Sequence, residues 1–346
     1  MDQIKLTQFS HGGGCGCKIA PAVLSKLLAH APAGIVPPEL LVGTETADDA
    51  AVYKLNERQA IVATTDFFTP IVDDPYDFGR IAATNALSDV YAMGGRPIMA
   101  LALVGMPLDK LPPEVIGRIL EGGASVCRDA GIPIAGGHSI DVLEPIYGLV
   151  GLGVVDPAEV KKNAGAQAGD VLILTKPLGI GILSAGLKKG LLADADYAEM
   201  LRWTTLLNRV GARLAGMGGV HAVTDVTGFG LAGHLLEICR GSKLGATLSF
   251  DALPKIAAAE KLVREGIATG ASTRNWASYG DDVRMAADAP EWQRKFITDP
   301  QTSGGLLIAC AESGVEAVLA AIRAEQGSEG HVIGRMVAGE AVLRVE

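Results

Sequence analysis

Short apolar runs and longer segments of helical period follow one another along the chain, which predicts a mixture of strands and helices. In the first half, apolar runs bounded by turn residues predict strands at Ala50–Leu55, Ala60–Thr65, Pro97–Met106, Ile132–Ala135 and Ile146–Val155. Helices are predicted at Ala20–His30, where Pro21 suits the first turn, at Asp77–Met93, which Gly94-Gly95 ends, and at Pro112–Ala130, which prolines begin and Gly131 ends.

The composition shifts at Lys161–Asp170, a run of small and polar residues that predicts a hinge between two domains. Beyond it, strands are predicted at Val171–Thr175, from Val223, and at Leu306–Cys310, Val332–Met336 and Val342–Val345. Helices are predicted at Gly181–Lys189, Ala198–Met217, Gly230–Cys239 and Val315–Glu325, whereas Gly266–Pro290 has no clear pattern. Strands and helices mix throughout, so we expect an α/β to α+β fold.

The composition narrows the class of protein. The chain has 346 residues, 49% of them hydrophobic, and a net charge of -9, which argues against a general nucleic-acid binder. It has no apolar run of about 18 residues and no apolar core of a signal peptide at its start. Five cysteines, an odd number, do not suggest a disulfide framework. We therefore expect a reduced, cytoplasmic protein that binds neither nucleic acid nor membrane.

The segment 11–18, HGGGCGCK, carries two thiols and a cation among four glycines. Its glycines favour conformational freedom over a regular helix or packed strand, so residues 1–18 are predicted to form a flexible arm. Lys18 should favour the reactive thiolate form of the neighbouring cysteines. Half of a metal site is a weaker interpretation, because no second Cys or His pair follows at zinc-finger spacing. A tail without a role stays open at this stage.

Aspartates recur where predicted strands end or begin: Asp48 and Asp49 before one strand, and Asp66 and Asp225 after two others. Asp89 lies one helical turn after Asn85, on the same face of a predicted helix. Carboxylates in apolar surroundings are costly unless they are paired or bound to a metal, and oxygen-rich sites suit Mg²⁺. Each aspartate taken singly could instead cap a helix or form a turn.

Seven motifs in family order resemble the selenophosphate synthetases, also called selenide, water dikinases. They are HGGGCGCK (11–18), ETADDAAV (45–52), TTDFF (64–68), GRIAATNALSD (79–89), AGGHSI (135–140), TDVTGFG (224–230) and DPQTSGG (299–305). Looser forms of the aspartate motifs occur in a wider superfamily of ATP-using enzymes, including aminoimidazole ribonucleotide synthetase. The cysteine-lysine segment narrows the resemblance to the selenium enzymes.

The resemblance implies formation of selenophosphate, AMP and phosphate from ATP, selenide and water. It implies a catalytic arm (1–18), an ATP-binding domain that dimerises through its sheet (19–160) and an α+β C-terminal domain (161–346). The residues that match functional positions of the family are Cys15 and Lys18 for catalysis, Asp49, Asp89 and Asp225 for magnesium, and Lys18, Thr46, Ala47, Asp48, Asp66, Asp89, Gly137, His138 and Ser139 for ATP. K⁺ is a candidate second cation, and the expected partners are a second copy of the chain and enzymes that use selenophosphate to make selenocysteine-tRNA and selenouridine-tRNA.

The residues by themselves leave open one alternative role for His138 and two alternative functions for the protein. The residues around His138 follow a predicted strand and could turn backbone N–H groups toward phosphate, but a hydrogen-bonded structural histidine fits the spacing equally. A different ATP-dependent enzyme would keep the aspartates without needing Cys15 and Lys18. A metal or selenium carrier would need the cysteines but not the aspartates.

Overall fold

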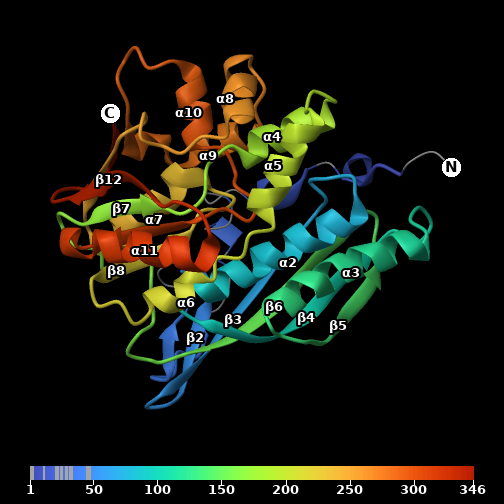
Figure 1. Ribbon diagram of the computed structural model, residues 1–346, viewed down its shortest axis with the longest axis horizontal. Coiled ribbons are helices and arrows are strands. Elements are labelled where there is room, and N and C mark those ends of the chain that lie inside the picture. The colour runs from blue at the N-terminus through green and yellow to red at the C-terminus, as the bar shows by residue number, and fades with distance from the viewer. Residues whose placement is uncertain are drawn as a thin grey trace.

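The computed structural model describes residues 4–10, 12–19, 23, 26–27, 30, 34–43 and 48–346. They form two mixed α/β units, each built on its own sheet, with helix α2 between them (Figure 1). This confirms the predicted fold class. The helix predicted at 20–30 lies largely outside the described residues. Among the described residues, no helix has the length and apolar character needed to cross a membrane.

The first sheet has the strand order β1-β2-β3-β6-β4-β5, and only β4 and β5 run parallel. Its strands are β1 Leu40–Val42, β2 Ala51–Asn56, β3 Gln59–Phe68, β4 Arg96–Met106, β5 Ile134–Asp141 and β6 Ile146–Val155. Along β3, buried positions alternate with more exposed ones, as expected of a sheet that is covered on one face. Helices α2 (Pro75–Ala92) and α3 (Pro113–Asp129) cover that face (Figure 1).

Helix α2 is buried almost all round from Phe78 onward. It packs on β3 and β6, on α3, and on β8 of the second unit, so it has no face left for solvent. Glycines allow the close approach of α3: a Cβ at Gly79 would lie 1.9 Å from the Ile119 carbonyl oxygen, and one at Gly122 would lie 2.0 Å from that of Tyr76. Polar side chains on α2 are therefore held in fixed positions at the junction of the two units.

The second sheet has the strand order β10-β13-β9-β12-β7-β11-β8. Its strands are β7 Val171–Leu174, β8 Val220–Asp225, β9 Gly245–Leu248, β10 Val283–Arg284, β11 Leu306–Cys310, β12 His331–Val337 and β13 Leu343–Val345. The helices around it are α4 Ile180–Lys188, α5 Asp194–Thr204, α6 Val210–Leu214, α7 Gly230–Ser242, α8 Ala257–Arg264, α9 Gly270–Tyr279, α10 Glu291–Ile297 and α11 Val315–Gln326. Every residue of β7 and β11 is buried, which places the core of this unit at the centre of its sheet.

Two predicted elements differ from the structure. The single helix predicted at Ala198–Met217 is wrong, because the chain breaks between α5 and α6, where the buried amide of Asn208 donates to Ser88 Oγ and to the Gly304 carbonyl. The strand predicted at Ile132–Ala135 runs on to Asp141, so residues 136–139 lie within β5 and not in a turn after it. Tertiary hydrogen bonds and pairing with β4 decided both differences.

Candidate active site

Three carboxylates from distant parts of the sequence meet at the junction of the two units. Asp49 lies just before β2, Asp89 lies on α2, and Asp225 ends β8. One carboxylate oxygen of each lies within 4.8 Å of the others. The structure thus brings together the three aspartates that the resemblance assigns to magnesium.

Burial and mutual repulsion make this cluster unfavourable without a cation. The pKa of each of the three carboxyl groups is raised above its ordinary value, first by burial. The Asp225 charge raises the pKa of Asp49 and Asp89 further. Thr224 Oγ1 donates to Asp49 at 2.9 Å and Thr64 Oγ1 donates to Asp89, but Asp49 Oδ2 and Asp225 Oδ2 are buried without a hydrogen-bond partner. These unpaired oxygens fit a hard divalent cation, for which carboxylate oxygens are the usual ligands.

The described part of the arm is docked at the same junction. Gly14–Cys17 forms a short 3-10 helix where an irregular loop was expected, and Cys15 is 1% exposed. The Cys15 N–H donates to Thr302 Oγ1 at 3.0 Å, and the Gly14 N–H donates to the Thr69 carbonyl at 2.8 Å. Gly14 has a φ of 54°, and a Cβ there would lie 2.3 Å from both Ile71 Cγ2 and Thr302 Oγ1. Only glycine fits this contact, and the predicted mobility of the arm stays a prediction.

The surroundings of Cys15 favour its neutral thiol. Asn85 Oδ1 accepts the Ser303 N–H at 2.7 Å, and Asn85 Nδ2 donates to Asp66 Oδ2 at 2.8 Å, so the orientation of the amide is determined. The Cys15 thiol lies 3.2 Å from Asn85 Oδ1, which can only accept, so the thiol donates. Burial raises the pKa of Cys15 well above its ordinary value, and the opposing effect of Lys18 is smaller. The predicted thiolate is therefore wrong for this docked arrangement.

Lys18 links the arm to the first sheet. Its Nζ forms an ion pair with Asp66 Oδ2 at 3.1 Å, while its side chain remains 36% exposed. Burial lowers the pKa of Lys18, but the nearby carboxylates of Asp66, Asp89 and Asp225 outweigh burial, and the pKa is held well above its ordinary value. Asp66 lies within β3, which continues to Phe68, and not at the end of a strand as expected. Lys18 therefore stays a cation beside the thiol.

The other predicted ATP residues do not all come together in this chain. Asp48 accepts the Asn163 N–H at 2.7 Å, next to the segment that connects the two units, and residues 46 and 47 lie outside the described residues. Gly137, His138 and Ser139 lie exposed on the edge strand β5. Strands β4 and β6 lie between β5 and β3 in the sheet, so these three residues are separated from the carboxylate cluster.

Sequence reasoning missed the residues that hold Cys15. It noted Asn85 only as a neighbour of Asp89 on one helix face, and Thr302 and Ser303 only as part of a motif. Ser303 has a φ of 54°, an unusual conformation for a residue with a side chain. The fully buried Lys176 donates to the Ser303 carbonyl at 2.9 Å and stabilises this turn. No spacing in the sequence connects Lys176 or Ser303 with Cys15.

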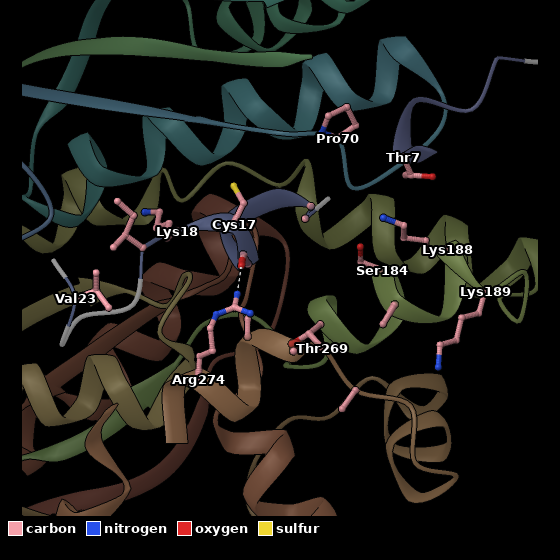
Figure 2. Close-up of a pocket in the computed structure, with 18 residues that line it drawn as sticks. Thr7, Cys17, Lys18, Val23, Pro70, Ser184, Lys188, Lys189, Thr269 and Arg274 are labelled. Atoms are coloured by element: carbon pink, nitrogen blue, oxygen red, sulfur yellow. Dashed lines mark hydrogen bonds between the residues drawn. The ribbon is translucent and has the colours of Figure 1, made fainter. Parts of the chain in front are cut away.

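A cavity of about 630 Å³ lies beside the arm, and none of the three clustered aspartates is among its described lining residues (Figure 2). Gly12, Gly13, Gly16, Cys17 and Lys18 of the arm line one side, and residues of α4 and α9 line the other. Its volume is in the range of small-molecule sites. Lys18 lines this cavity and also contacts Asp66, so one side chain connects the cavity with the surroundings of Cys15.

Comparisons with known proteins agree with the motifs. The family described as AIR synthase related protein matches with its N-terminal domain at residues 47–155 and its C-terminal domain at residues 167–346. The chain is 64% identical over 341 residues to the selenide, water dikinase of Burkholderia orbicola (strain MC0-3), a match that covers 99% of this chain and 96% of that protein. It is 61% identical over 344 residues to that of Dechloromonas aromatica (strain RCB), covering 99% of both.

Among solved structures, thiamine-monophosphate kinase from Stenotrophomonas maltophilia K279a has a TM-score of 0.66 over 94% of each chain, at 21% identity. At that identity the likeness shows a shared fold. The two sequence matches extend over nearly the whole chain and include the arm with Cys15 and Lys18. The chain belongs to the selenide, water dikinase family.

Proposed function

We propose that this protein makes selenophosphate from selenide, ATP and water, with release of AMP and phosphate. One observation carries the proposal: a thiol and a lysine of the arm meet the three-carboxylate cluster at one junction. Cys15 contacts Asn85, which lies one helical turn from Asp89, and Lys18 pairs with Asp66. The carboxylates alone would suit many ATP-using enzymes, whereas the thiol and the lysine suit a soft, anionic acceptor such as hydroselenide.

In this proposal Asp49, Asp89 and Asp225 hold Mg²⁺, as their buried and unpaired oxygens support. When bound, Mg²⁺ would neutralise and polarise the phosphate oxygens of ATP. The nucleotide is proposed to bind on the side of the arm that faces these three carboxylates. Its contacts there are proposed to include Asp48, Asp66 and residues 46 and 47. A K⁺ ion stays a prediction from the resemblance alone.

The arm supplies the acceptor side of the reaction. Lys18, held by Asp66, offsets the negative charge of the arriving hydroselenide next to a polyphosphate. Once the Cys15 thiol has broken its hydrogen bond to Asn85 Oδ1, its sulfur is proposed to contact selenium. In the docked arrangement Gly14 and Cys15 are buried, and we expect this part of the arm to keep water away from the first phosphoryl transfer. Water must reach the remaining ADP in the second step, so the arm has to move during the cycle.

A second copy of the chain is proposed to cover the open face of the first sheet. Tyr53, Phe67 and Ile140 are 42%, 47% and 51% exposed there, on β2, β3 and β5. The strand register runs from His138 through Leu103 and Gly148 to Phe67, so His138 lies on the same open face of the sheet as Phe67. A second copy packed on this face would contact His138. In such a dimer, Gly137, His138 and Ser139 of one copy could contact a nucleotide bound by the other copy. Sedimentation of the wild type and of Phe67→Asp tests this arrangement, which predicts a dimer that the substitution weakens.

The reaction itself is tested by ³¹P NMR of mixtures containing protein, ATP and magnesium, with and without selenide. The proposal predicts AMP, phosphate and a signal with phosphorus–selenium coupling, all dependent on selenide. A phosphorylated product without selenium would indicate a different ATP-dependent enzyme. Selenium binding without AMP formation would indicate a carrier.

We place the protein in the cytoplasm, where its five cysteines, all free, would stay reduced. Selenophosphate would pass from there to the enzymes that make selenocysteine-tRNA and selenouridine-tRNA.

A further inference from the structure

The cavity beside the arm is lined by cations from three segments. Lys18 comes from the arm, Lys188 and Lys189 from the end of α4, and Arg274 from α9 (Figure 2). We call it the cationic cavity. No Asp or Glu is among its described lining residues, and none of the described carboxylates pairs with Lys188, Lys189 or Arg274. In a chain with a net charge of -9, this is a local reversal of sign.

Two of these cations also hold the arm. Arg274 donates to the Gly16 carbonyl at 2.9 Å, and Lys188 donates to the Ser10 carbonyl at 3.1 Å. Each contact uses one donor, so further N–H groups of the guanidinium and the ammonium remain for a ligand. The arm thus forms one wall of the cavity, and its other side faces Asn85 and Asp66 through Cys15 and Lys18.

We propose that the cationic cavity is the site through which the selenium-bearing anion reaches and leaves the catalytic thiol, as hydroselenide before the reaction and as selenophosphate after it. This inference rests on the proposed function. It places the small anion on the side of the arm opposite the carboxylates, where ATP is proposed to bind. Substrate and product then share a route that does not cross the nucleotide. Lys18 lines the cavity and also pairs with Asp66, so the anion would pass from one side of the arm to the other at Lys18.

Electrostatics gives the cavity this function. A concave surface of one sign concentrates counter-ions and speeds their association, and salt weakens the effect. Hydroselenide is small and makes few contacts, so charge is the main property by which the protein can collect it. Cys17, half-buried on the cavity wall, adds a second sulfur beside the route.

The test uses thiophosphate, a stable analogue of selenophosphate, titrated calorimetrically into the full chain without nucleotide or magnesium. Without metal the carboxylates repel anions, so binding reports on the cationic cavity. We expect the double variant Lys188→Gln/Lys189→Gln to bind thiophosphate on the order of tenfold more weakly, because it loses two of the four positive charges that line the cavity. The same variant should raise the KM for selenide by a similar factor and leave the KM for ATP unchanged.

Two matched variants serve as controls. Lys188→Arg/Lys189→Arg keeps both charges and should keep the thiophosphate affinity, which separates charge from packing. Lys261→Gln removes one charge from an exposed position on α8 outside the cavity and should have no effect. Thermal melts confirm that each variant is folded.

Equal thiophosphate affinity in the wild type and the double glutamine variant, or no binding to the wild type at millimolar concentration, would overturn the inference. If the wild type binds thiophosphate as expected but makes no selenophosphate, the proposed function fails while the anion site stands.

Discussion

Substitution of Asp225 by asparagine separates a metal site from a set of turn and cap residues. The side chain is 1% exposed, and its carboxylate lies within 4.8 Å of those of Asp49 and Asp89. Asparagine keeps the size and most hydrogen bonds but removes the charge. We expect the metal-free variant to be more stable than the metal-free wild type, because repulsion inside the cluster is relieved.

The magnitude follows from the distance. Two full charges 4.8 Å apart repel by about 3.5 kcal/mol at an effective dielectric constant of about 20. Because Lys18 and a hydrogen bond from Ser88 offset part of this repulsion at Asp225, we expect a smaller gain, roughly 2 kcal/mol, in the free energy of unfolding. For a chain of 346 residues this corresponds to an increase in Tm of about 3 °C.

The dependence on pH has a definite sign. The folded protein binds more protons than the unfolded chain, because the pKa of each carboxyl group is raised on folding. The free energy of unfolding of the metal-free wild type therefore falls as pH rises above about 4 toward the raised pKa values. Asp225→Asn should show a smaller fall over the same range.

The assay combines thermal melts at several pH values, with and without magnesium, and ATP turnover against magnesium concentration. Magnesium should stabilise the wild type more than the variant, so that the order of their Tm values reverses, and turnover of the variant should be nearly lost. Asp288→Asn, on an exposed loop, is the matched control and should change neither quantity. Near-normal turnover of Asp225→Asn, with no change in its response to magnesium, would refute the reasoning, since asparagine caps about as well as aspartate.

Three further predictions concern the arm and the turn that follows α10. Cys15→Ser keeps a hydroxyl donor for the contact with Asn85 Oδ1, so the variant should fold normally, but it should make no selenophosphate by ³¹P NMR. Cys17→Ser should keep most activity, and equal losses in the two variants would indicate a joint role of the two thiols. Gly14→Ala places a methyl group 2.3 Å from Thr302 Oγ1 and should undock the arm, so iodoacetamide should alkylate Cys15 at least tenfold faster than in the wild type, and an unchanged rate would contradict the docked arrangement. Burial raises the pKa of Asp299 to about 8, so its contribution to the free energy of unfolding should fall as pH rises from about 4 to about 8, and Asp299→Asn should flatten this part of the denaturation profile measured in urea.

Local pattern in the sequence predicted most of the regular elements. The strand predicted at Ile146–Val155 has the bounds of β6, and the helix predicted at Asp77–Met93 differs from α2 by two residues at its start and one at its end. Proline at the start and Gly94-Gly95 after the end determine this helix through local backbone geometry. The break between α5 and α6 was missed because it depends on contacts of Asn208 with residues far away in the sequence.

The site divides in the same way. The types of residue it contains, carboxylates for a hard cation and a thiol beside a lysine, were read from motifs in the sequence. Which residues meet was decided by tertiary structure, because Asp49, Asp89 and Asp225 approach only when α2 is buried between two sheets. The state of Cys15 was decided there as well. In the sequence its neighbour is Lys18, which favours the thiolate, but in the fold burial and Asn85 Oδ1 outweigh that charge and favour the thiol. Spacing along a chain determines local backbone geometry, whereas desolvation and charge depend on every segment packed around a group.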